Sequence, residues 1–180
     1  IAVQAPTPSA PPRLIAPPRG MRPVIAGFGP GGLFAALTLA RAGLRPIVLE
    51  RGERVDQRAQ TTSAFAGGGP LNPESNIQFG EGGAGAFSDG KLTTGIKDRR
   101  CRLVLKELAE HGAPEEICYE ARPHIGTDRL PKVVAAIREE ILALGGEVRF
   151  STRLTTLKTR AGSLTAVEYQ SREEKGEIET

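Results

Sequence analysis

The sequence predicts an α/β fold in which a parallel sheet is followed by a small antiparallel meander. Two observations support this fold class: a strand–helix–strand pattern over residues 23–50, and a change near residue 151 from helical spacing of apolar residues to alternation with polar ones. A strand–helix–strand unit of this length joins parallel strands through a right-handed crossover. The 180 residues are enough for one domain with its own hydrophobic core.

The strand–helix–strand unit has clear boundaries. Residues 23–26 are apolar and predict a short strand. A helix is predicted from Pro30 to Ala42, because proline suits the first helical turn and Gly43 suits the position just after the end. This helix is apolar on nearly every side, so we expect it to be buried. The segment Pro46–Glu50 predicts a second buried strand, with its proline at the first position, where a missing N–H is tolerated.

The next hundred residues alternate between predicted elements and loops. The elements are a helix over 55–66, a helix over 98–111, a strand over 117–121, a helix over 127–145 and a strand over 147–150. Asp98 is expected to cap the second helix, and Thr127 or Asp128 the third. The buried face of the third helix is predicted to consist of Leu130, Val133, Val134, Ile137, Ile141 and Leu144.

The two ends of the chain differ from the middle. Residues 1–22 are rich in proline and alanine, a composition that favours extended conformations and cannot bury a core, so we expect a linker from an upstream domain. Residues 151–180 alternate between apolar and polar side chains and predict the antiparallel meander. The chain begins with Ile1 rather than methionine, and we expect it to be part of a longer protein whose domain starts at residue 23.

A glycine motif lies between the first strand and the helix. In Gly27-Phe28-Gly29-Pro30-Gly31-Gly32, the first glycine permits a tight turn, Gly29 lets a pyrophosphate approach the backbone, and Gly32 lets the helix pack closely on the sheet. The N–H groups at the helix start then bind the phosphates. Glu50, at the end of the second strand, is placed to accept hydrogen bonds from an adenosine ribose. The motif therefore predicts a Rossmann-like dinucleotide site.

The acid at the end of the second strand also restricts which dinucleotide binds. The charge of Glu50 would repel a 2′-phosphate and disfavours NADP, whereas FAD and NAD both have a free ribose hydroxyl and are not separated by the motif. Arg51 is expected either to point into solvent or to contact the FAD phosphates.

A second glycine-rich segment lies within residues 67–97 and predicts a cofactor loop. Glycines that recur from 80 to 90 give a backbone that can approach a flat or charged ligand closely. We expect Gly82, Gly83, Ser88 and Lys91 to contact a pyrophosphate or a flavin ring. The alternative is a flexible surface loop, but Asn76, Gln78 and Phe79 at its start are not typical of a flexible linker.

Other residues and the overall charge favour few further functions. His124 is a weak candidate proton donor, because a histidine beside a predicted helix cap is more often structural. Cys101 and Cys118 form no redox or metal-binding pattern, so no metal site is predicted. The net charge of +3 is spread along the chain and aromatic residues are scarce, which disfavours a nucleic-acid partner. No apolar run or signal peptide predicts a membrane partner, and we expect a cytoplasmic protein.

From residue 24 to 150 the chain resembles a bacterial family of FAD-dependent dehydrogenases described as NAD(FAD)-utilising. The resemblance lies in the glycine motif, in Val48-Leu49-Glu50-Arg51-Gly52, in residues 71–76, in the second glycine segment through Leu92, and in residues 123–130. The family resemblance implies a flavoprotein with two dinucleotide folds, with the ADP half of FAD on the first motif and the rest of FAD along residues 80–91.

The resemblance also implies that further domains precede and follow this chain, and that the segment that contacts the flavin ribityl chain lies beyond residue 180. We therefore expect an FAD-dependent oxidoreductase with a small-molecule substrate, NAD(P)H being a candidate electron donor, and expect this truncated chain alone to be inactive. Two alternatives stay open: an NAD-binding domain of a non-flavin dehydrogenase, and a non-enzymatic module that binds a flavin or nucleotide.

Overall fold

The computed structural model describes residues 20–88, 90–96 and 98–180, so residues 1–19 of the predicted linker lie outside it. Within these residues a parallel sheet is formed by β1 (Val24–Ala26), β2 (Ile47–Leu49) and β3 (Glu147–Arg149), in the order β1-β2-β3. Both pairings are parallel. The predicted parallel sheet is therefore confirmed, with β2 at its centre.

Helix α1 (Pro30–Arg41) connects β1 to β2 as predicted. Proline occupies its first turn, and Gly43 after its end has a φ of 76°, which is the left-handed conformation that a helix-terminating glycine adopts. One face of α1 packs on the sheet and on α4 (Leu130–Ala143). Together with Phe28 these two helices form the main hydrophobic core, on the side of the sheet to which Val48 points.

The path from β2 to β3 is long and leaves the sheet. It contains α2 (Val55–Ala66), the short 3₁₀ helix η1 (Gly83–Phe87), α3 (Arg100–Glu110), the 3₁₀ helix η2 (Glu115–Cys118) and α4. The helix predicted over 55–66 is confirmed with its bounds. Asp98 accepts a hydrogen bond from the N–H of Arg100 at 2.8 Å, but the N-cap residue of α3 is Arg99, one residue later than predicted.

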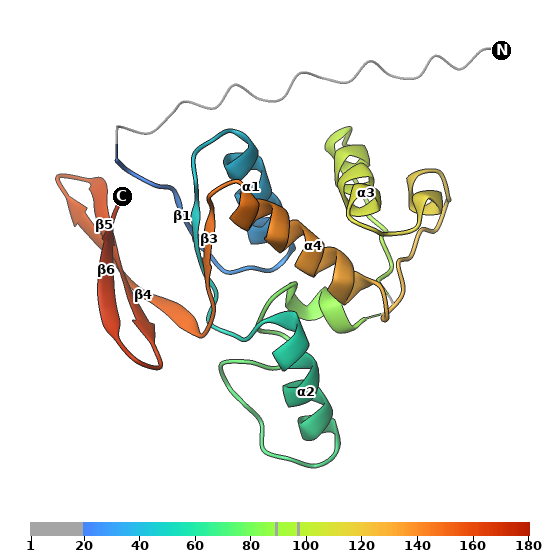
Figure 1. The fold of residues 1–180 in the computed structure, drawn as a ribbon, viewed down its shortest axis with the longest axis horizontal. Coiled ribbons are helices and arrows are strands. Elements are labelled where there is room, and N and C mark those ends of the chain that lie inside the picture. The colour runs from blue at the N-terminus through green and yellow to red at the C-terminus, as the bar shows by residue number, and fades with distance from the viewer. Residues whose placement is uncertain (1–19, 89, 97) are drawn as a thin grey trace.

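An antiparallel meander covers the other face of the parallel sheet, as Figure 1 shows. Its strands are β4 (Thr152–Arg160), β5 (Ser163–Ser171) and β6 (Lys175–Glu179). Side chains alternate across a strand, so Ile47 and Leu49 point away from Val48 and meet Val167 and Tyr169 of the meander. The fold thus has three layers: α1 and α4, the parallel sheet, and the meander.

Two predicted details are wrong. The strand predicted over 117–121 is instead η2, because the N–H of Ile117 bonds the carbonyl of Pro114 at 3.2 Å and only Ile117 of this segment is buried. Neither Thr127 nor Asp128 caps α4, which begins after a turn in which Leu130 N–H bonds Gly126 O.

The buried face of α4 also differs in part from the prediction. Leu144 is 40% exposed, because the helix ends at Ala143, whereas Arg138 is buried on this face beside the apolar side chains. None of the helices described is long and apolar enough to cross a membrane.

Ion pairs join α1, α3 and α4 on the outer side of the helical layer. Arg41 donates from Nε to Glu140 at 2.6 Å and from Nη1 to Glu107 at 2.7 Å. His111 Nε2 lies 2.8 Å from the other oxygen of Glu140. The Arg41 hydrogen bond, with a smaller effect of His111, holds the pKa of Glu140 below its usual value. Glu140 is therefore charged down to lower pH in the folded chain than in the unfolded one.

We expect Glu140→Gln to lower the free energy of unfolding at pH 7 by about 0.5–1 kcal/mol, since the groups are part-exposed. Because the folded pKa is lowered, this stabilisation is complete above the ordinary value of 4.5 and is lost as the pH falls through the folded value. The variant should therefore show a weaker dependence of stability on pH below 4.5 in denaturant titrations.

The matched control is Glu110→Gln, which removes only the exposed pair with Lys106. Equal losses in the two variants at pH 7 would contradict a specific role of Glu140.

Candidate functional site

The glycine turn between β1 and α1 is tied to the end of β2 by a buried carboxylate. Glu50 is 4% exposed, and its two oxygens accept hydrogen bonds from Phe28 N–H at 2.6 Å and Gly52 N–H at 2.8 Å. Gly27 N–H bonds the carbonyl of Leu49 at 2.8 Å. The acid predicted at a ribose therefore also fixes the shape of the turn. Each carboxylate oxygen can accept a further bond, so these contacts leave acceptor capacity for a ligand.

The three motif glycines meet different constraints. Gly27 has a φ of 89°, which favours glycine. A Cβ on Gly32 would lie 2.0 Å from the carbonyl oxygen of Gly27, so only glycine allows α1 to pack this closely. A Cβ on Gly29 would find its nearest atom, the Cα of Gly83, at 3.9 Å. The fold itself therefore does not require glycine at position 29.

Backbone donors gather at the start of α1. The first intrahelical bond runs from Leu33 N–H to Gly29 O at 2.9 Å. Gly31 and Gly32 precede it, and N–H groups of a first helical turn have no intrahelical acceptor. Such groups, aided by the helix dipole, suit a phosphate.

The second glycine segment packs directly on this turn. Gly82 N–H bonds Phe28 O at 2.9 Å, and Gly83 lies against Gly29. The same segment also approaches the residues after β2. A Cβ on Gly52 would lie only 2.5 Å from the Cα of Gly80, so the two backbones are in direct contact. Two segments that are fifty residues apart in the sequence therefore form one surface.

Asparagine side chains give the loop that leads into this segment a defined shape. Asn72 Oδ1 accepts the N–H groups of Glu74 and Ser75 at 3.0 and 3.2 Å, and Asn76 Oδ1 accepts those of Gln78 and Phe79 at 2.9 and 3.3 Å. These are side chain-to-backbone turns of the Asx kind. This hydrogen bonding disfavours the alternative of a flexible surface loop.

A buried arginine of α2 holds the same loop in place. Arg58 is 0% exposed and donates to the carbonyls of Asn76, Ile77 and Glu81, each at 2.7 Å. Its guanidinium also lies over the ring of Phe87, 4.8 Å from the centroid. Burial lowers the pKa of Arg58 from its ordinary value. A planar group with donors in several directions is suited to three carbonyls at once.

A buried ion pair connects the second glycine segment to α4. Arg138 Nη1 lies 2.8 and 2.6 Å from the two oxygens of Glu81, and Glu81 also accepts the N–H of Val55 at 2.8 Å. Both side chains are buried. Burial raises the pKa of Glu81 from its ordinary value.

A cavity of about 460 Å³, which we name the turn cavity, opens between the glycine turn, the second glycine segment and β4. It is lined by Ala26, Gly27, Gly29, Leu49, Glu50, Arg51, Gln78, Phe79, Gly80, Gly83, Arg153 and Leu154. It lies at the carboxyl ends of β1 and β2, where open α/β sheets bind their ligands. Its walls combine apolar surface, backbone, one acid and two arginines.

The predicted site residues divide into two groups. Those that line the turn cavity are Gly27, Gly29, Glu50, Arg51 and Gly83. Those that do not are Pro30, Gly31 and Gly32 in the first turn of α1, Gly82 beneath it, and Ser88, Lys91 and His124 further along. As cofactor contacts, all of these residues stay predictions.

The residues outside the cavity have local contacts. Ser88 donates to Gly85 O at 2.8 Å and accepts Gly90 N–H at 3.1 Å, which are turn contacts. Lys91 and His124 face each other in an antiparallel bridge, and the His124 side chain is exposed. Arg51 neither points freely into solvent nor is isolated, because it bonds Glu74 and lies over the ring of Phe79.

Three residues of the site region were missed from the sequence: Arg58, Arg138 and Arg153. Arg58 and Arg138 lie on helices, where an arginine is usually solvated, and the carbonyl partners of Arg58 have no sequence signature. Arg153 lies in a strand of the meander, which the sequence does not connect with the turn cavity. The burial of Arg138 could have been predicted from the sequence, because the residue falls on the apolar face of α4.

A comparison with protein families finds a match for the part of the chain that contains the glycine turn. Residues 22–84 match the family model described as FAD binding domain. This match spans the glycine turn, Glu50 and the start of the second glycine segment. It confirms the prediction that FAD is the dinucleotide of this fold, and disfavours the NAD-only alternative.

A protein of Clostridium beijerinckii described as uncharacterised is 61% identical over 146 residues, which are 81% of this chain and 27% of that protein. The chain therefore spans about a quarter of the length of this relative.

Solved structures share the fold at low sequence identity. The 3-ketosteroid-Δ4-(5α)-dehydrogenase of Rhodococcus jostii has a TM-score of 0.53 at 17% identity, over 87% of this chain and 43% of that one. The glycerol-3-phosphate dehydrogenase of Bacillus halodurans, complexed with FAD, has a TM-score of 0.54 at 12% identity, over 91% of this chain and 33% of that one. The L-amino acid deaminase of Proteus vulgaris has a TM-score of 0.53 at 14% identity, over 97% of this chain and 56% of that one. These similarities confirm the predicted fold class.

We expect Arg58→Met to lower the free energy of unfolding by about 2–4 kcal/mol, because it leaves three buried carbonyls without their donor. Arg58→Lys should recover only part of this loss, since an ammonium group lacks the planar fork that reaches all three. Denaturant unfolding measures the stability, and hydrogen exchange of residues 76–81 reports whether the loop opens locally.

Arg54→Met is the matched control for this prediction, because Arg54 begins the same helix with its side chain 47% exposed. If Arg58→Met and Arg54→Met were equally stable, Arg58 would not hold the loop.

Proposed function

We propose that the full-length protein is an FAD-dependent oxidoreductase in which this chain binds the ADP half of FAD in the turn cavity. The observation that carries the proposal is the open space at Gly29. The fold leaves room for a Cβ there, yet the position faces the cavity, where a bare backbone lets a pyrophosphate approach. The FAD-binding-domain match over residues 22–84 supports the same cofactor.

Each group around the cavity has a role in this proposal. The N–H groups of Gly31 and Gly32 bind the pyrophosphate with the help of the α1 dipole. Glu50 accepts hydrogen bonds from the ribose, and the backbone contacts that hold it fix its position before FAD binds. Leu49 and Leu154 offer apolar surface to the adenine.

The remaining parts of FAD would extend past Gly83 toward Ser88 and Lys91. Bound FAD would accept a hydride from substrate, and the protein would position the ring. NAD(P)H is the candidate electron donor, and the substrate is a small molecule. The exposed side chain of His124 lies outside the turn cavity, so it contacts neither the ribose nor the pyrophosphate placed there.

The protein lies in the cytoplasm, where thiols such as Cys101 and Cys118, both free in the structure, stay reduced. Residues 1–180 have no turnover by themselves, because other domains of the full-length protein supply the rest of the flavin and substrate sites.

The direct test is an absorbance spectrum of the full-length protein purified without added cofactor. Flavin bands that denaturation releases as FAD are the expected result. A colourless protein that binds NAD and cannot be loaded with FAD would replace the proposal with a non-flavin dehydrogenase. Bound FAD that no electron donor reduces would favour a non-enzymatic flavin module.

We expect Gly29→Val in the full-length protein to weaken FAD binding at least a hundredfold, roughly 3 kcal/mol, while the protein stays folded. The added side chain would fill the space between the turn and the pyrophosphate, and the backbone of Gly29, with φ at −72°, accepts any residue. Fluorescence titration with FAD measures the affinity, and the thermal unfolding midpoint reports the fold.

Gly95→Val is the control, since a Cβ there also meets nothing within 4 Å and residue 95 lies outside the cavity. Unchanged FAD affinity in Gly29→Val would remove the glycine turn from the binding site.

A further inference from the structure

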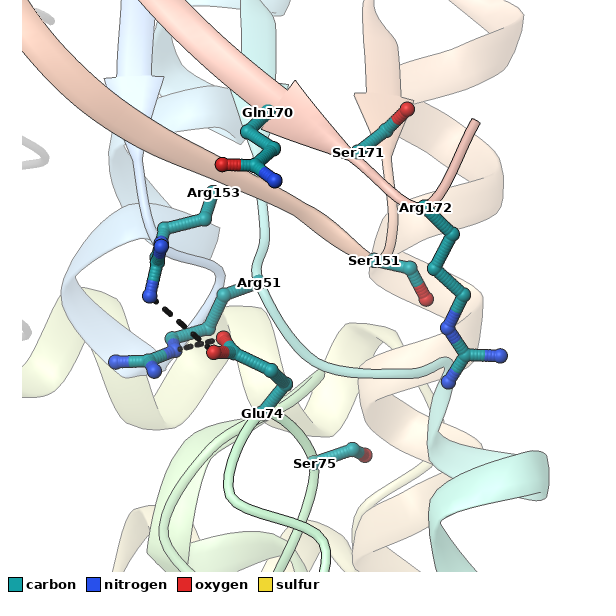
Figure 2. A pocket seen from close by; sticks show the side chains of 8 residues that line it. All are labelled: Arg51, Glu74, Ser75, Ser151, Arg153, Gln170, Ser171 and Arg172. Carbon is teal, nitrogen blue, oxygen red and sulfur yellow. Dashed lines mark hydrogen bonds and ion pairs between the residues drawn. The ribbon is translucent and has the colours of Figure 1, made fainter. Parts of the chain in front are cut away.

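A second hollow of about 280 Å³ shares Arg51 and Arg153 with the turn cavity, and Figure 2 shows the side chains that line it. We name it the arginine hollow, and its lining residues are Arg51, Glu74, Ser75, Ser151, Arg153, Gln170, Ser171 and Arg172. These residues come from the end of β2, from the 72–76 loop and from the meander. No group of the turn cavity other than the two shared arginines reaches into it.

The arginines of the hollow keep most of their donors unused. Arg51 donates from Nε to Glu74 at 2.8 Å, Arg153 from Nη1 to Glu74 at 3.2 Å, and Arg172 from Nη2 to Glu53 at 3.2 Å. Among the described residues, the other N–H groups of these guanidinium groups have no hydrogen-bond partner. Three guanidinium groups thus face two carboxylates, so one positive charge is in excess.

The arginines also stand on different sides of the hollow. Figure 2 shows Arg51 and Arg153 converging on Glu74, while Arg172 lies across from them beside Ser151. A ligand in the hollow would therefore meet guanidinium donors from more than one direction. Glu74 competes for two of them, but its side chain is 42% exposed and can turn toward solvent.

Ser151 adds an independent observation. Its φ of 50° is rare for a residue with a Cβ, and glycine would adopt it without strain. Its N–H bonds Gly52 O at 2.9 Å, which holds the backbone in place, whereas its hydroxyl has no partner within the described part of the chain. Strained backbone that places an unpartnered polar group in a hollow is characteristic of binding sites.

We propose that the arginine hollow binds the phosphate group of a small-molecule ligand other than FAD. Guanidinium groups bind phosphate through paired, charge-assisted hydrogen bonds, and donors on several sides match a tetrahedral group better than a planar carboxylate. Arg172 and the hydroxyl of Ser151 hold the phosphate, and Arg51 and Arg153, which converge on Glu74 across the hollow, add positive charge to the opposite wall. The hollow does not include Gly29 or Glu50, so it differs from the site proposed for FAD, although Arg51 and Arg153 line both.

The test is a calorimetric titration of the full-length protein with inorganic phosphate, at constant ionic strength so that screening does not change. We expect saturable binding that Arg172→Gln weakens about tenfold, the effect of losing one charge-assisted contact. Ser151→Gly should weaken phosphate binding several-fold, and Glu74→Gln should strengthen it, because it removes the competing carboxylate.

Matched controls separate binding from charge and strain. Arg160→Gln removes an arginine from the far end of β4, and Ala161→Gly relieves the same φ of 50° in the β4–β5 turn. Both should leave phosphate binding unchanged, and Ser151→Gly should change the unfolding midpoint no more than Ala161→Gly does.

Absence of saturable binding at millimolar phosphate would overturn the proposal, and so would equal weakening by Arg172→Gln and Arg160→Gln. FAD content is measured on the same samples. Phosphate binding by a protein that cannot be loaded with FAD would refute the proposed function and leave the phosphate site standing, whereas bound FAD without phosphate binding would do the reverse.

Discussion

The guanidinium group of Arg58 is the contact on which the shape of the candidate site depends. It is buried beneath the loop that follows α2 and binds three of its carbonyls. That loop ends in Gly80, Gly82 and Gly83, which lie against the glycine turn and the end of β2. If the loop moved, one wall of the turn cavity would move with it, although none of the Arg58 side chain lines that cavity.

Two buried acids extend this arrangement in opposite directions. Glu50 ties the glycine turn to β2, and so to the centre of the parallel sheet. Glu81 ties the second glycine segment to Arg138, and so to the helical layer. Backbone without side chains has little surface with which to pack, and these polar contacts replace the packing that the glycines cannot provide. The resulting site is built largely from main chain but is held by charged side chains.

The sequence predicts well the parts of this fold that local patterns determine. Helix α1 was predicted to within one residue of its boundaries, because Pro30 and Gly43 mark its ends and its surface is apolar. The residues around 117 were assigned to the wrong element, because a single buried side chain, Ile117, produces no periodicity. Arg58 escaped prediction for another reason: its partners are backbone carbonyls, which are present at every residue and leave no trace in the sequence. The glycine turn and Glu50 were found because their steric and charge requirements restrict which residues can stand there.

The junction between the two sheets has a consequence for how this fold can vary in length. Only Phe150 and Ser151 separate β3 from β4, and this link is bonded to the Glu50 segment through Ser151 N–H to Gly52 O and Thr152 N–H to Glu50 O. An inserted or deleted residue at this link would shift the meander relative to Glu50 and break these two hydrogen bonds. Within the described part of the chain, the hairpin tip at Ala161 and Gly162 has no such bonds to the parallel sheet, so extra segments, tags or whole inserted domains belong at that end of the meander.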